Sequence, residues 1–414
     1  MLKILIVEDE QEKRRLIAAA VLGTQGINEE DVEYATDVSA AKRAIRRCRF
    51  DLVILDINLP EKPDAYATAG AGLQVVSFIK NNVAAKPPGY LVGMTAYDES
   101  ADAAADEFAS PLWKLVRFSY TENGWKQSLE LALEYLVQKH RPPYVSDGKT
   151  YHTDLAIFTA LDEELESVLA LNANWSQEVV AHDHARYYVG TFASQHRPMR
   201  VVAVAAPRMG MPPAAAVAAK LISTFRPRTL VIAGICAGVR GKTELGDILI
   251  ADPCFDWGSG KWVRDETTSE LRFRPAPYQW RLDERLRAGA RAVALTPGIL
   301  DGIHRQFEGA RPAKTPRVII DAMASGASVL QAARLVDDVR DQHKNLVGVE
   351  MESYAVFTAA EYASEPRPAC IAIKSVCDFG DETKSDDAHT YASYTSAQFL
   401  HSFATEFLAG EEVA

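Results

Sequence analysis

Two short apolar runs that each end in acidic residues constrain the fold of this chain most. The run LKILIVEDE ends at Glu8 and Asp9, and the run FDLVILDINLP contains Asp56 at the end of its apolar block. Short blocks of aliphatic and β-branched residues closed by polar residues are typical of buried parallel strands. Because the carboxyl ends of parallel strands meet at one edge of a doubly wound sheet, we expect the three carboxylates to converge there.

Three converging carboxylates predict a cation site beside a phospho-acceptor. For any one of these acids alone, a strand-end turn former or a helix cap is the better interpretation. Three carboxylates held close together repel one another, so their convergence is unfavourable without a cation. Mg²⁺ suits one or two carboxylates combined with a phosphoryl group. The start of the chain is therefore predicted to be a phospho-acceptor module in which Asp56 is the nucleophile.

Residues 1 to 140 alternate between strand-like and helix-like segments, which predicts a parallel sheet with helices on both faces. The segment resembles the receiver domain of two-component response regulators, a flavodoxin-like fold. That resemblance implies that Glu8 and Asp9 hold Mg²⁺ together with Asp56, which takes the phosphoryl group, and that Thr95 in LVGMTA is the switch hydroxyl. The expected helices lie near 12–22, 40–47, 73–80 and 127–137.

Two departures from the receiver pattern lie close to this site. Receivers carry a Lys-Pro pair at the end of the fifth strand, whereas this chain has PLWKLVRFS, so we expect Lys114 or Arg117 to serve instead. The loop after Asp56, NLPEKPDAYATAGAG, is longer than the short turn usual in the family. The resemblance implies a histidine kinase or phosphotransfer protein as partner, and the departures imply an altered coupling to the output surface.

Composition and charge exclude several functional classes. The 414 residues are enough for two domains, and 48% hydrophobic with 24% charged residues is usual for a soluble globular protein. No apolar run is long enough to span a bilayer and the start lacks a signal-peptide layout, so we expect a cytoplasmic protein without a membrane partner. The net charge of −11 argues against nucleic acid as a partner. The five cysteines show no zinc-type spacing, so we expect reduced, mostly buried thiols.

A polar, proline-containing segment divides the chain. QKHRPPYVSDGKT combines charges, a Pro-Pro pair and Ser-Asp-Gly, which is typical of a domain linker. We expect a first domain over 1–139, a linker over 140–153 and a second domain over 154–410. Strand-like runs such as DLAIFTAL, TLVIAGICAGV and ACIAIKSVCD alternate there with helical segments, which predicts an α/β domain with a mixed central sheet.

Four segments of the second domain carry residues suited to chemistry. In TALDEELESV three acids, residues 162–164, open a helix, and taken alone they are best interpreted as helix caps. AGICAGVRGKTELGDILIADP places small residues after a strand, where a ligand can approach the backbone. VGVEMESYAV holds Glu350 and Glu352, and buried acids need partners such as sugar hydroxyls. AIKSVCDFGDETK places Asp378 at a strand end, as a turn former or an acid/base.

The four segments in this order resemble the nucleoside phosphorylase and nucleosidase family, closest to its 5′-methylthioadenosine/S-adenosylhomocysteine nucleosidase branch. The acid triplet, GICAGV, LGDILIADP and residues 349–352 match that branch, while Cys377 stands where the family has a serine before Asp378. The resemblance implies a homo-oligomer, and no cofactor is expected in this domain.

The resemblance implies a role for each residue in cleaving a purine N-glycosidic bond. The bond breaks through an oxocarbenium-like sugar, and adenine leaves poorly as an anion, so an acid must protonate its N7. Asp378 is the expected acid, Glu164 the expected base for the incoming water, and Glu352 the expected ligand of the ribose hydroxyls. The other expected substrate contacts are Met351, Glu350 and Val329, the last at the position of the family's aromatic platform.

Two arginines bear on the choice of nucleophile. A phosphorylase needs basic groups for inorganic phosphate, and Arg208 and Arg240 lie next to small-residue turns where they fit that need. They fit the 5′-phosphates of a nucleotide equally well. The acid triplet favours water, so hydrolysis is the expected reaction.

A receiver joined to a purine nucleosidase resembles the effectors of Detocs-type phage-defence two-component systems. Those effectors are ATP nucleosidases, so the resemblance implies phosphorylation-gated release of adenine and ribose 5′-triphosphate from ATP. The first alternative is a receiver-regulated methylthioadenosine/S-adenosylhomocysteine nucleosidase or a purine nucleoside phosphorylase. The second is a non-catalytic response regulator that senses a purine, and the third is a receiver that acts only as a protein-interaction switch.

Overall fold

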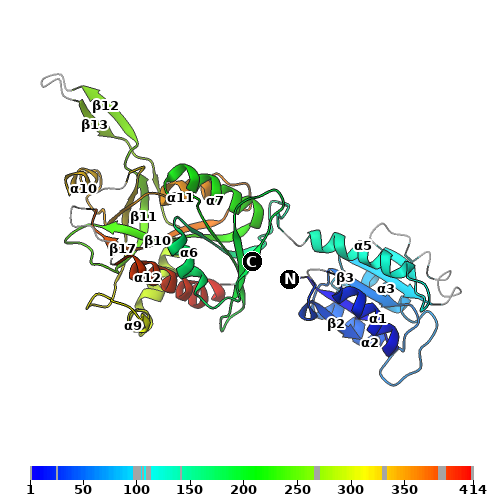
Figure 1. Ribbon diagram of the computed structural model, residues 1–414. Helices are drawn as coiled ribbons and strands as arrows, with labels where there is room; N and C mark the ends of the chain where they lie inside the picture. Colours follow the sequence, from blue (N-terminus) through cyan, green and yellow to red (C-terminus); the bar gives the residue numbers. More distant parts are fainter. Residues whose placement is uncertain are drawn as a thin grey trace. The chain divides into compact units, whose positions relative to one another are not determined.

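The chain consists of two compact units, Met1–Pro142 and Pro143–Ala414 (Figure 1). The structure is a computed structural model. None of the helices that it describes is both long and apolar enough to cross a bilayer. It describes residues 2–24, 27–96, 104, 107–108, 113–139, 142–264, 271–328, 333–380 and 388–411.

The first unit contains a five-stranded, fully parallel sheet in the order β2-β1-β3-β4-β5. This is the doubly wound, flavodoxin-like order, so the predicted fold class of the first unit is confirmed. Strands β1 and β3 are buried along their whole length, as their uninterrupted apolar runs predict. The strands are β1 (Ile4–Val7), β2 (Val32–Ala35), β3 (Leu52–Asp56), β4 (Tyr90–Thr95) and β5 (Trp113–Arg117).

Helices cover both faces of this sheet. One apolar core packs α1 and α5 against one face, and a second core packs α2 and α3 against the other. The Asp37 side chain caps α2 by accepting a hydrogen bond from the amide of Ala40 at 2.8 Å. The helices are α1 (Gln11–Leu22), α2 (Val38–Arg47), α3 (Leu73–Asn81) and α5 (Gly124–Lys139).

The second unit is built on a ten-stranded mixed sheet, which confirms the predicted fold class. Strand β10 lies at its centre, parallel to β6 and β17 and antiparallel to β16. Strands β12 and β13 form a separate antiparallel hairpin that projects from the domain in Figure 1. The strands are β6 (Thr153–Thr159), β7 (Ser176–Glu178), β8 (Tyr187–Phe192), β9 (Met199–Ala205), β10 (Pro227–Gly238), β11 (Ile248–Asp256), β12 (Gly260–Arg264), β13 (Leu271–Pro275), β14 (Gln279–Trp280), β15 (Val318–Ser325), β16 (Gly348–Glu350) and β17 (Ala369–Asp378).

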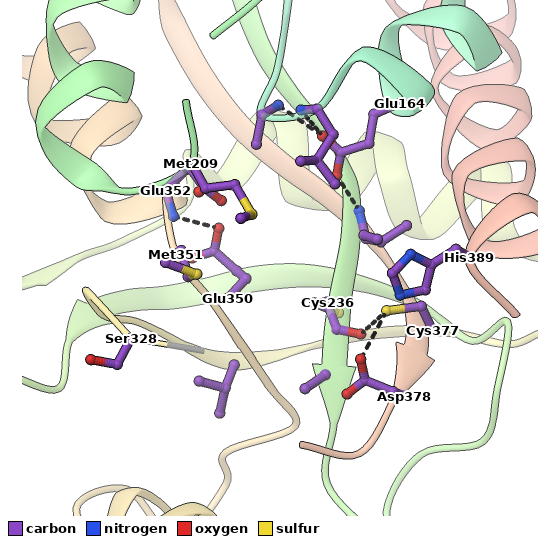
Figure 2. Close-up of a pocket in the computed structure, with 15 residues that line it drawn as sticks. Glu164, Met209, Cys236, Ser328, Glu350, Met351, Glu352, Cys377, Asp378 and His389 are labelled. Atoms are coloured by element: carbon purple, nitrogen blue, oxygen red, sulfur yellow. Dashed lines mark hydrogen bonds between the residues drawn. The ribbon is translucent and has the colours of Figure 1, made fainter. Parts of the chain in front are cut away.

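Two apolar cores join helices to the two faces of the mixed sheet. Helices α7 and α11 pack on one face, and α6, α8, α9 and α12 pack on the other. Residues at or next to the starts of α6, α11 and α12, namely Glu164, Glu352 and His389, come together in Figure 2. The helices are α6 (Asp162–Leu169), α7 (Met211–Phe225), α8 (Glu284–Leu295), α9 (Ile299–Gln306), α10 (Ala333–Arg340), α11 (Ser353–Glu361) and α12 (His389–Ser402).

Candidate functional site

A pocket lies at the carboxyl ends of the central strands of the second unit (Figure 2). Glu164 reaches it from α6, Glu352 from the start of α11, and Asp378 from the end of β17. Glu350 and Met351 also line it. The structure therefore brings the residues expected to act as base, ribose ligand and acid around one cavity.

Backbone amides hold the Glu164 carboxylate in a single orientation. Its Oε2 accepts hydrogen bonds from the amides of Ala160 (2.7 Å) and Leu161 (3.0 Å), and its Oε1 accepts one from Ile235 (2.8 Å). The bond from Leu161 caps α6, which agrees with the capping interpretation of the acid triplet. The bond from Ile235 ties the same carboxylate to β10, so one side chain serves both the helix and the pocket.

Gly234 makes the room that Glu164 occupies. A Cβ at this position of β10 would lie 1.9 Å from Glu164 Oε1, and the backbone has a φ of +155° that residues with side chains rarely adopt. The small residues of TLVIAGICAGV thus allow a close approach of the Glu164 side chain to the strand.

Glu350 and Glu352 have different partners although they are two residues apart. The Glu350 carboxylate accepts hydrogen bonds from the amides of Glu352 (2.9 Å) and Ser353 (2.9 Å) and from the hydroxyl of Ser325. It therefore caps the start of α11. Glu352 Oε1 accepts a hydrogen bond from the amide of Gly210 at 2.7 Å, and its side chain lies at the pocket wall.

Lys374 is a buried cation that sequence reasoning missed. Its Nζ lies 3.8 Å from Glu350 and 3.9 Å from Glu164, and the residue is 1% exposed. Burial acts to lower the pKa of this ammonium, but attraction from Glu164, Glu350 and Glu352 outweighs burial and raises the pKa. Burial also raises the pKa of Glu352 to about 7, against the lowering attraction of Lys374. The sequence does contain a signal for it, because a lysine inside the apolar run ACIAIKSVCD must be buried with the strand.

A β-bulge places Cys377 and Asp378 on the same side of β17. Strands β10 and β17 are in register up to the pair Cys236–Val376, after which Ala237 pairs with Asp378. Cys377 is the extra residue, so two successive side chains that alternate across a regular strand both line the pocket. The Cys377 thiol lies 3.5 Å from Asp378 Oδ2.

His389 also lines the pocket, and sequence reasoning missed it as well. It is the first residue of α12, and its Nδ1 lies 3.2 Å from Glu163 Oε1. The second acid of the triplet therefore orients an imidazole at the pocket wall. A single histidine in a polar stretch matches no motif, so the sequence contains no signal for this contact.

The two arginines expected to bind phosphate are not among the residues that line the pocket. Arg208 is exposed and precedes Met209, which does line it. Arg240 is exposed, and its guanidinium lies 4.4 Å from the centre of the Phe379 ring. Val329 lies outside the described residues.

The acids of the first unit converge at the edge of its sheet. Single carboxylate oxygens of Glu8, Asp9 and Asp56 lie within 4.8 Å of one another. The Nζ of Lys13, a buried residue of α1, lies 2.8 Å from Glu8 and 3.0 Å from Asp56. Burial raises the pKa of Glu8 to about 7, although Lys13 acts to lower it. The lysine at this site therefore comes from α1, a contact that the sequence did not indicate.

The residues expected to switch the first unit lie on β4 and β5. Thr95 is buried at the end of β4 and pairs with Arg117 at the end of β5. Lys114 pairs with Val92, three residues before that end, which is about 10 Å along the strand. Arg117 is thus the nearer of the two candidates to the edge where Asp56 lies.

The chain is similar to several known proteins. Residues 154–409 match the phosphorylase superfamily. The uncharacterized protein y4jS of Sinorhizobium fredii is 30% identical over 96% of this chain and 97% of its own length. The ATP nucleosidase Cap17 of Escherichia coli is 24% identical over 66% of this chain and 54% of its own, so the chain spans about half the length of that relative.

Solved structures of similar proteins cover about three fifths of this chain. The 5′-methylthioadenosine/S-adenosylhomocysteine nucleosidase of Neisseria meningitidis is 21% identical, with 61% of this chain and 99% of that chain covered and a TM-score of 0.47. Futalosine hydrolase of Helicobacter pylori is 19% identical, with 61% and 98% covered and a TM-score of 0.48. Since the family match spans more than half of the chain, this protein belongs to the phosphorylase superfamily.

Proposed function

We propose that the second unit hydrolyses the N-glycosidic bond of a purine nucleotide, with ATP as the preferred substrate, and releases adenine and ribose 5′-triphosphate. The observation that carries this proposal is the convergence of Glu164, Glu352 and Asp378 in one pocket. These side chains supply a base, a sugar ligand and an acid, which are the groups that glycosidic hydrolysis needs. Similarity to the ATP nucleosidase Cap17 supports ATP as the substrate.

Each of the three acids has a distinct task in this reaction. Glu164, fixed by three amides, takes a proton from the water that attacks the sugar. Glu352 accepts hydrogen bonds from the ribose hydroxyls and so places the sugar over that water. Asp378 donates its proton to N7 of adenine as the bond breaks. The amide of Gly380 donates to Asp378 Oδ1 at 2.7 Å and holds the carboxyl group in place.

The pocket lining favours water over inorganic phosphate as the nucleophile. None of the described residues that line it is an arginine or a lysine, so phosphate meets no cation there. Arg208 and Arg240, outside the lining, are then assigned to the triphosphate of the substrate. The products are accordingly ribose 5′-triphosphate and free adenine, with no ribose 1-phosphate.

Phosphorylation of Asp56 controls this activity in our proposal. The oxygens of Glu8, Asp9 and Asp56 fit Mg²⁺, which prefers carboxylate ligands and offsets the charge of a phosphoryl group when bound. Lys13 adds a positive charge from the chain itself. A histidine kinase or phosphotransfer protein supplies the phosphoryl group. An ungated enzyme of this kind would exhaust the ATP of its host, which suits an effector of phage defence that is activated on infection.

Adenine release tests the proposal directly. The purified chain is incubated with ATP, adenosine or methylthioadenosine, with and without a small phosphodonor, and free adenine is measured. We expect release from ATP, and a fall of about 10²–10⁴-fold in turnover for Asp378→Asn, which keeps the shape but has no acidic proton. Cleavage of methylthioadenosine with ATP untouched would instead assign the chain the activity of a methylthioadenosine/S-adenosylhomocysteine nucleosidase. Release of ADP without free base would refute the nucleosidase function.

A further inference from the structure

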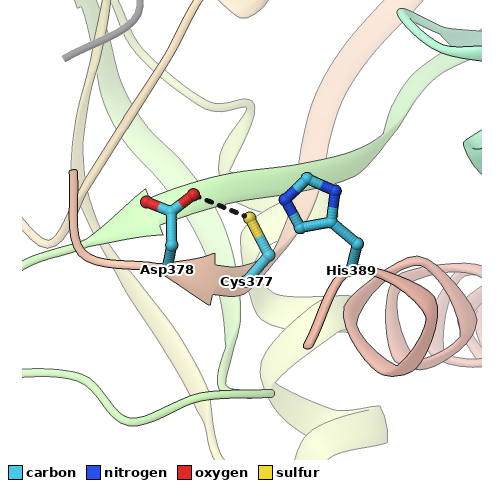
Figure 3. Close-up of side chains that lie close together, drawn as sticks. All are labelled: Cys377, Asp378 and His389. Carbon is cyan, nitrogen blue, oxygen red and sulfur yellow. Dashed lines mark hydrogen bonds between the residues drawn. The ribbon is translucent and has the colours of Figure 1, made fainter. Parts of the chain in front are cut away.

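Three side chains of different chemistry meet at one corner of the pocket (Figure 3). One ligand atom each from Cys377, Asp378 and His389 lies within 4.8 Å of the other two. Cys377 and Asp378 are buried and His389 is partly buried, and all three line the pocket. A thiol, a carboxylate and an imidazole are thus held together at a place that solutes reach through the substrate pocket.

The backbone builds this cluster in two ways. The bulge at Cys377 turns two successive side chains of β17 toward the same side. Helix α12 begins at His389, and the imidazole of this first residue lies near the end of β17. The cluster therefore depends on the tertiary structure and on a strand irregularity, not on a spacing of ligands along the sequence.

Glu163 orients the imidazole of this cluster. Its Oε1 lies 3.2 Å from His389 Nδ1. When Nδ1 donates its proton to this carboxylate, Nε2 carries the lone pair that a metal ion needs. Metal-ligating histidines usually donate their other ring N–H to a carboxylate or a carbonyl in this manner.

We propose that Cys377, Asp378 and His389 form an inhibitory site for a divalent metal ion of the Zn²⁺ class. Sulfur, nitrogen and carboxylate oxygen together suit Zn²⁺, which binds three protein ligands and leaves a fourth position for water. Mg²⁺ and Ca²⁺ prefer oxygen ligands alone, so this site discriminates against them. Binding releases two protons to solvent, one from the Cys377 thiol and one from the Asp378 carboxyl group, because the thiolate and the carboxylate are the ligands.

The metal ion inhibits the enzyme because it takes the carboxylate that the reaction uses. A metal-bound Asp378 has no proton to give to the purine, so glycosidic cleavage stops until the ion leaves. This consequence rests on the proposed function of Asp378, whereas the metal site itself does not. The serine that the nucleosidase branch carries in place of Cys377 is a poorer ligand for Zn²⁺.

Direct binding tests the site without reference to activity. The full-length chain is treated with a chelator, dialysed and titrated with Co²⁺, and the thiolate-to-metal charge-transfer band is followed, with Zn²⁺ added last to displace Co²⁺. With Mg²⁺ in excess to fill the carboxylate site of the first unit, we expect the band to saturate with one thiolate-bound Co²⁺ per chain in the wild type, and no such band for Cys377→Ser. Cys236→Ser, which removes another thiol from the same pocket, is the matched control and keeps the band. For Glu163→Gln we expect a loss of about 10- to 100-fold in affinity.

Several outcomes would overturn the site. They are a wild type without the band, a Cys377→Ser variant that retains it, and a Cys236→Ser variant that loses it while staying folded by circular dichroism. His389→Gln is a second variant. If it bound Co²⁺ as tightly as the wild type does, that result would also contradict the proposal.

Inhibition is then measured on the active enzyme. Zn²⁺ is expected to stop adenine release from the wild type, with full recovery on chelation, and to affect Cys377→Ser only at concentrations about 100-fold higher. Zn²⁺ that displaces Co²⁺ from the thiolate site but leaves turnover unchanged, or raises it, refutes the inhibitory role. If no substrate yields adenine, the proposed function fails, and the Co²⁺ titration still decides whether the metal site exists.

Discussion

At the scale of single residues, the pocket is organised around charges buried in pairs and groups. Glu164, Glu350 and Glu352 surround Lys374, so three acids share one ammonium beneath the site. Buried charges are tolerated when they are paired and hydrogen-bonded, and the amide donors to Glu164 and Glu350 supply those bonds. Lys374 therefore holds the acids in place and contributes no chemistry of its own.

Replacing Lys374 by methionine tests this arrangement. Lys374→Met leaves three buried carboxylates without a cation, and removal of one partner from a buried ion pair costs about 3–5 kcal/mol. The free energy of unfolding in urea measures the loss. Lys314→Met is the control, since Lys314 is 75% exposed and pairs at the surface with Glu244, which is 49% exposed, and such a pair contributes about 0–1 kcal/mol. Equal losses in the two variants would contradict a structural role for Lys374.

The elevated pKa of Glu352 predicts pH dependence. The pKa of this carboxyl group is near its ordinary value of 4.5 in the unfolded chain and about 7 in the folded one. Below pH 4.5 both states are protonated and nothing is lost, whereas the folded state loses about 3 kcal/mol as the pH rises from 4.5 to 7. Only the ionised form accepts hydrogen bonds from both ribose hydroxyls. We therefore expect the KM for ATP to fall as the pH rises through about 7, and Glu352→Gln to abolish this dependence. A KM that is constant with pH in the wild type contradicts the assignment.

At the scale of elements, the site depends on irregular points in otherwise regular strands. Strand β10 admits the Glu164 side chain at Gly234, and the bulge on β17 turns Cys377 and Asp378 to the same side. A side chain at position 234 would collide with Glu164, and a regular β17 would turn Cys377 and Asp378 to opposite faces. Departures from ideal strand geometry therefore create the space and the side-chain directions that the chemistry needs.

Gly234→Ala tests the first of these points. The added Cβ would lie 1.9 Å from Glu164 Oε1, so the carboxylate must move and its bond to the amide of Ile235 is lost. Overpacking of this kind lowers the free energy of unfolding by about 1–3 kcal/mol. We expect the rate of adenine release to fall as well. Gly302→Ala, within α9, is the control. Its added Cβ meets open space, so we expect the free energy of unfolding to rise by about 0.5–1 kcal/mol. Full activity in Gly234→Ala would remove Glu164 from the proposed mechanism.

At the scale of the whole molecule, two units with separate cores share one chain. The alignment with y4jS runs over 405 residues and so includes both units. In our proposal the first unit receives a phosphoryl group and the second destroys a nucleotide. The two functions are separable by mutation because their acids lie in different sheets.

Asp56→Asn separates the two functions. This variant has no carboxylate to phosphorylate, so labelling by a small phosphodonor should disappear. The stimulation of adenine release by the phosphodonor should disappear as well, while the basal rate of the second unit is retained. Radiolabel incorporation and adenine release are measured on the same samples, with Asp51→Asn, an acid at the other end of β3, as the control. Labelling that persists in Asp56→Asn contradicts its role as acceptor.

The sequence by itself determined the two fold classes, the helices of the first unit and the central strands of both units. Apolar runs such as LKILIVEDE and ACIAIKSVCD specify buried strands because their hydrophobic pattern is a local property of the chain. The helices expected in the first unit match the observed ones closely except at the start of α5, which begins at Gly124 instead of Gln127. Acids at strand ends and helix starts predicted both sites because the ends of parallel strands meet at one edge.

Only the tertiary structure decided which further side chains join each site. Lys374, His389 and Lys13 contact Glu164, Glu163 and Asp56, which are far away in sequence, and no local pattern encodes such a contact. The joint approach of Cys377 and Asp378 follows from the register between β10 and β17, which is set when the strands pair. Burial and register are properties of the packed domain. The buried lysines and the cluster of Cys377, Asp378 and His389 therefore form only once the sheet and its helices are assembled.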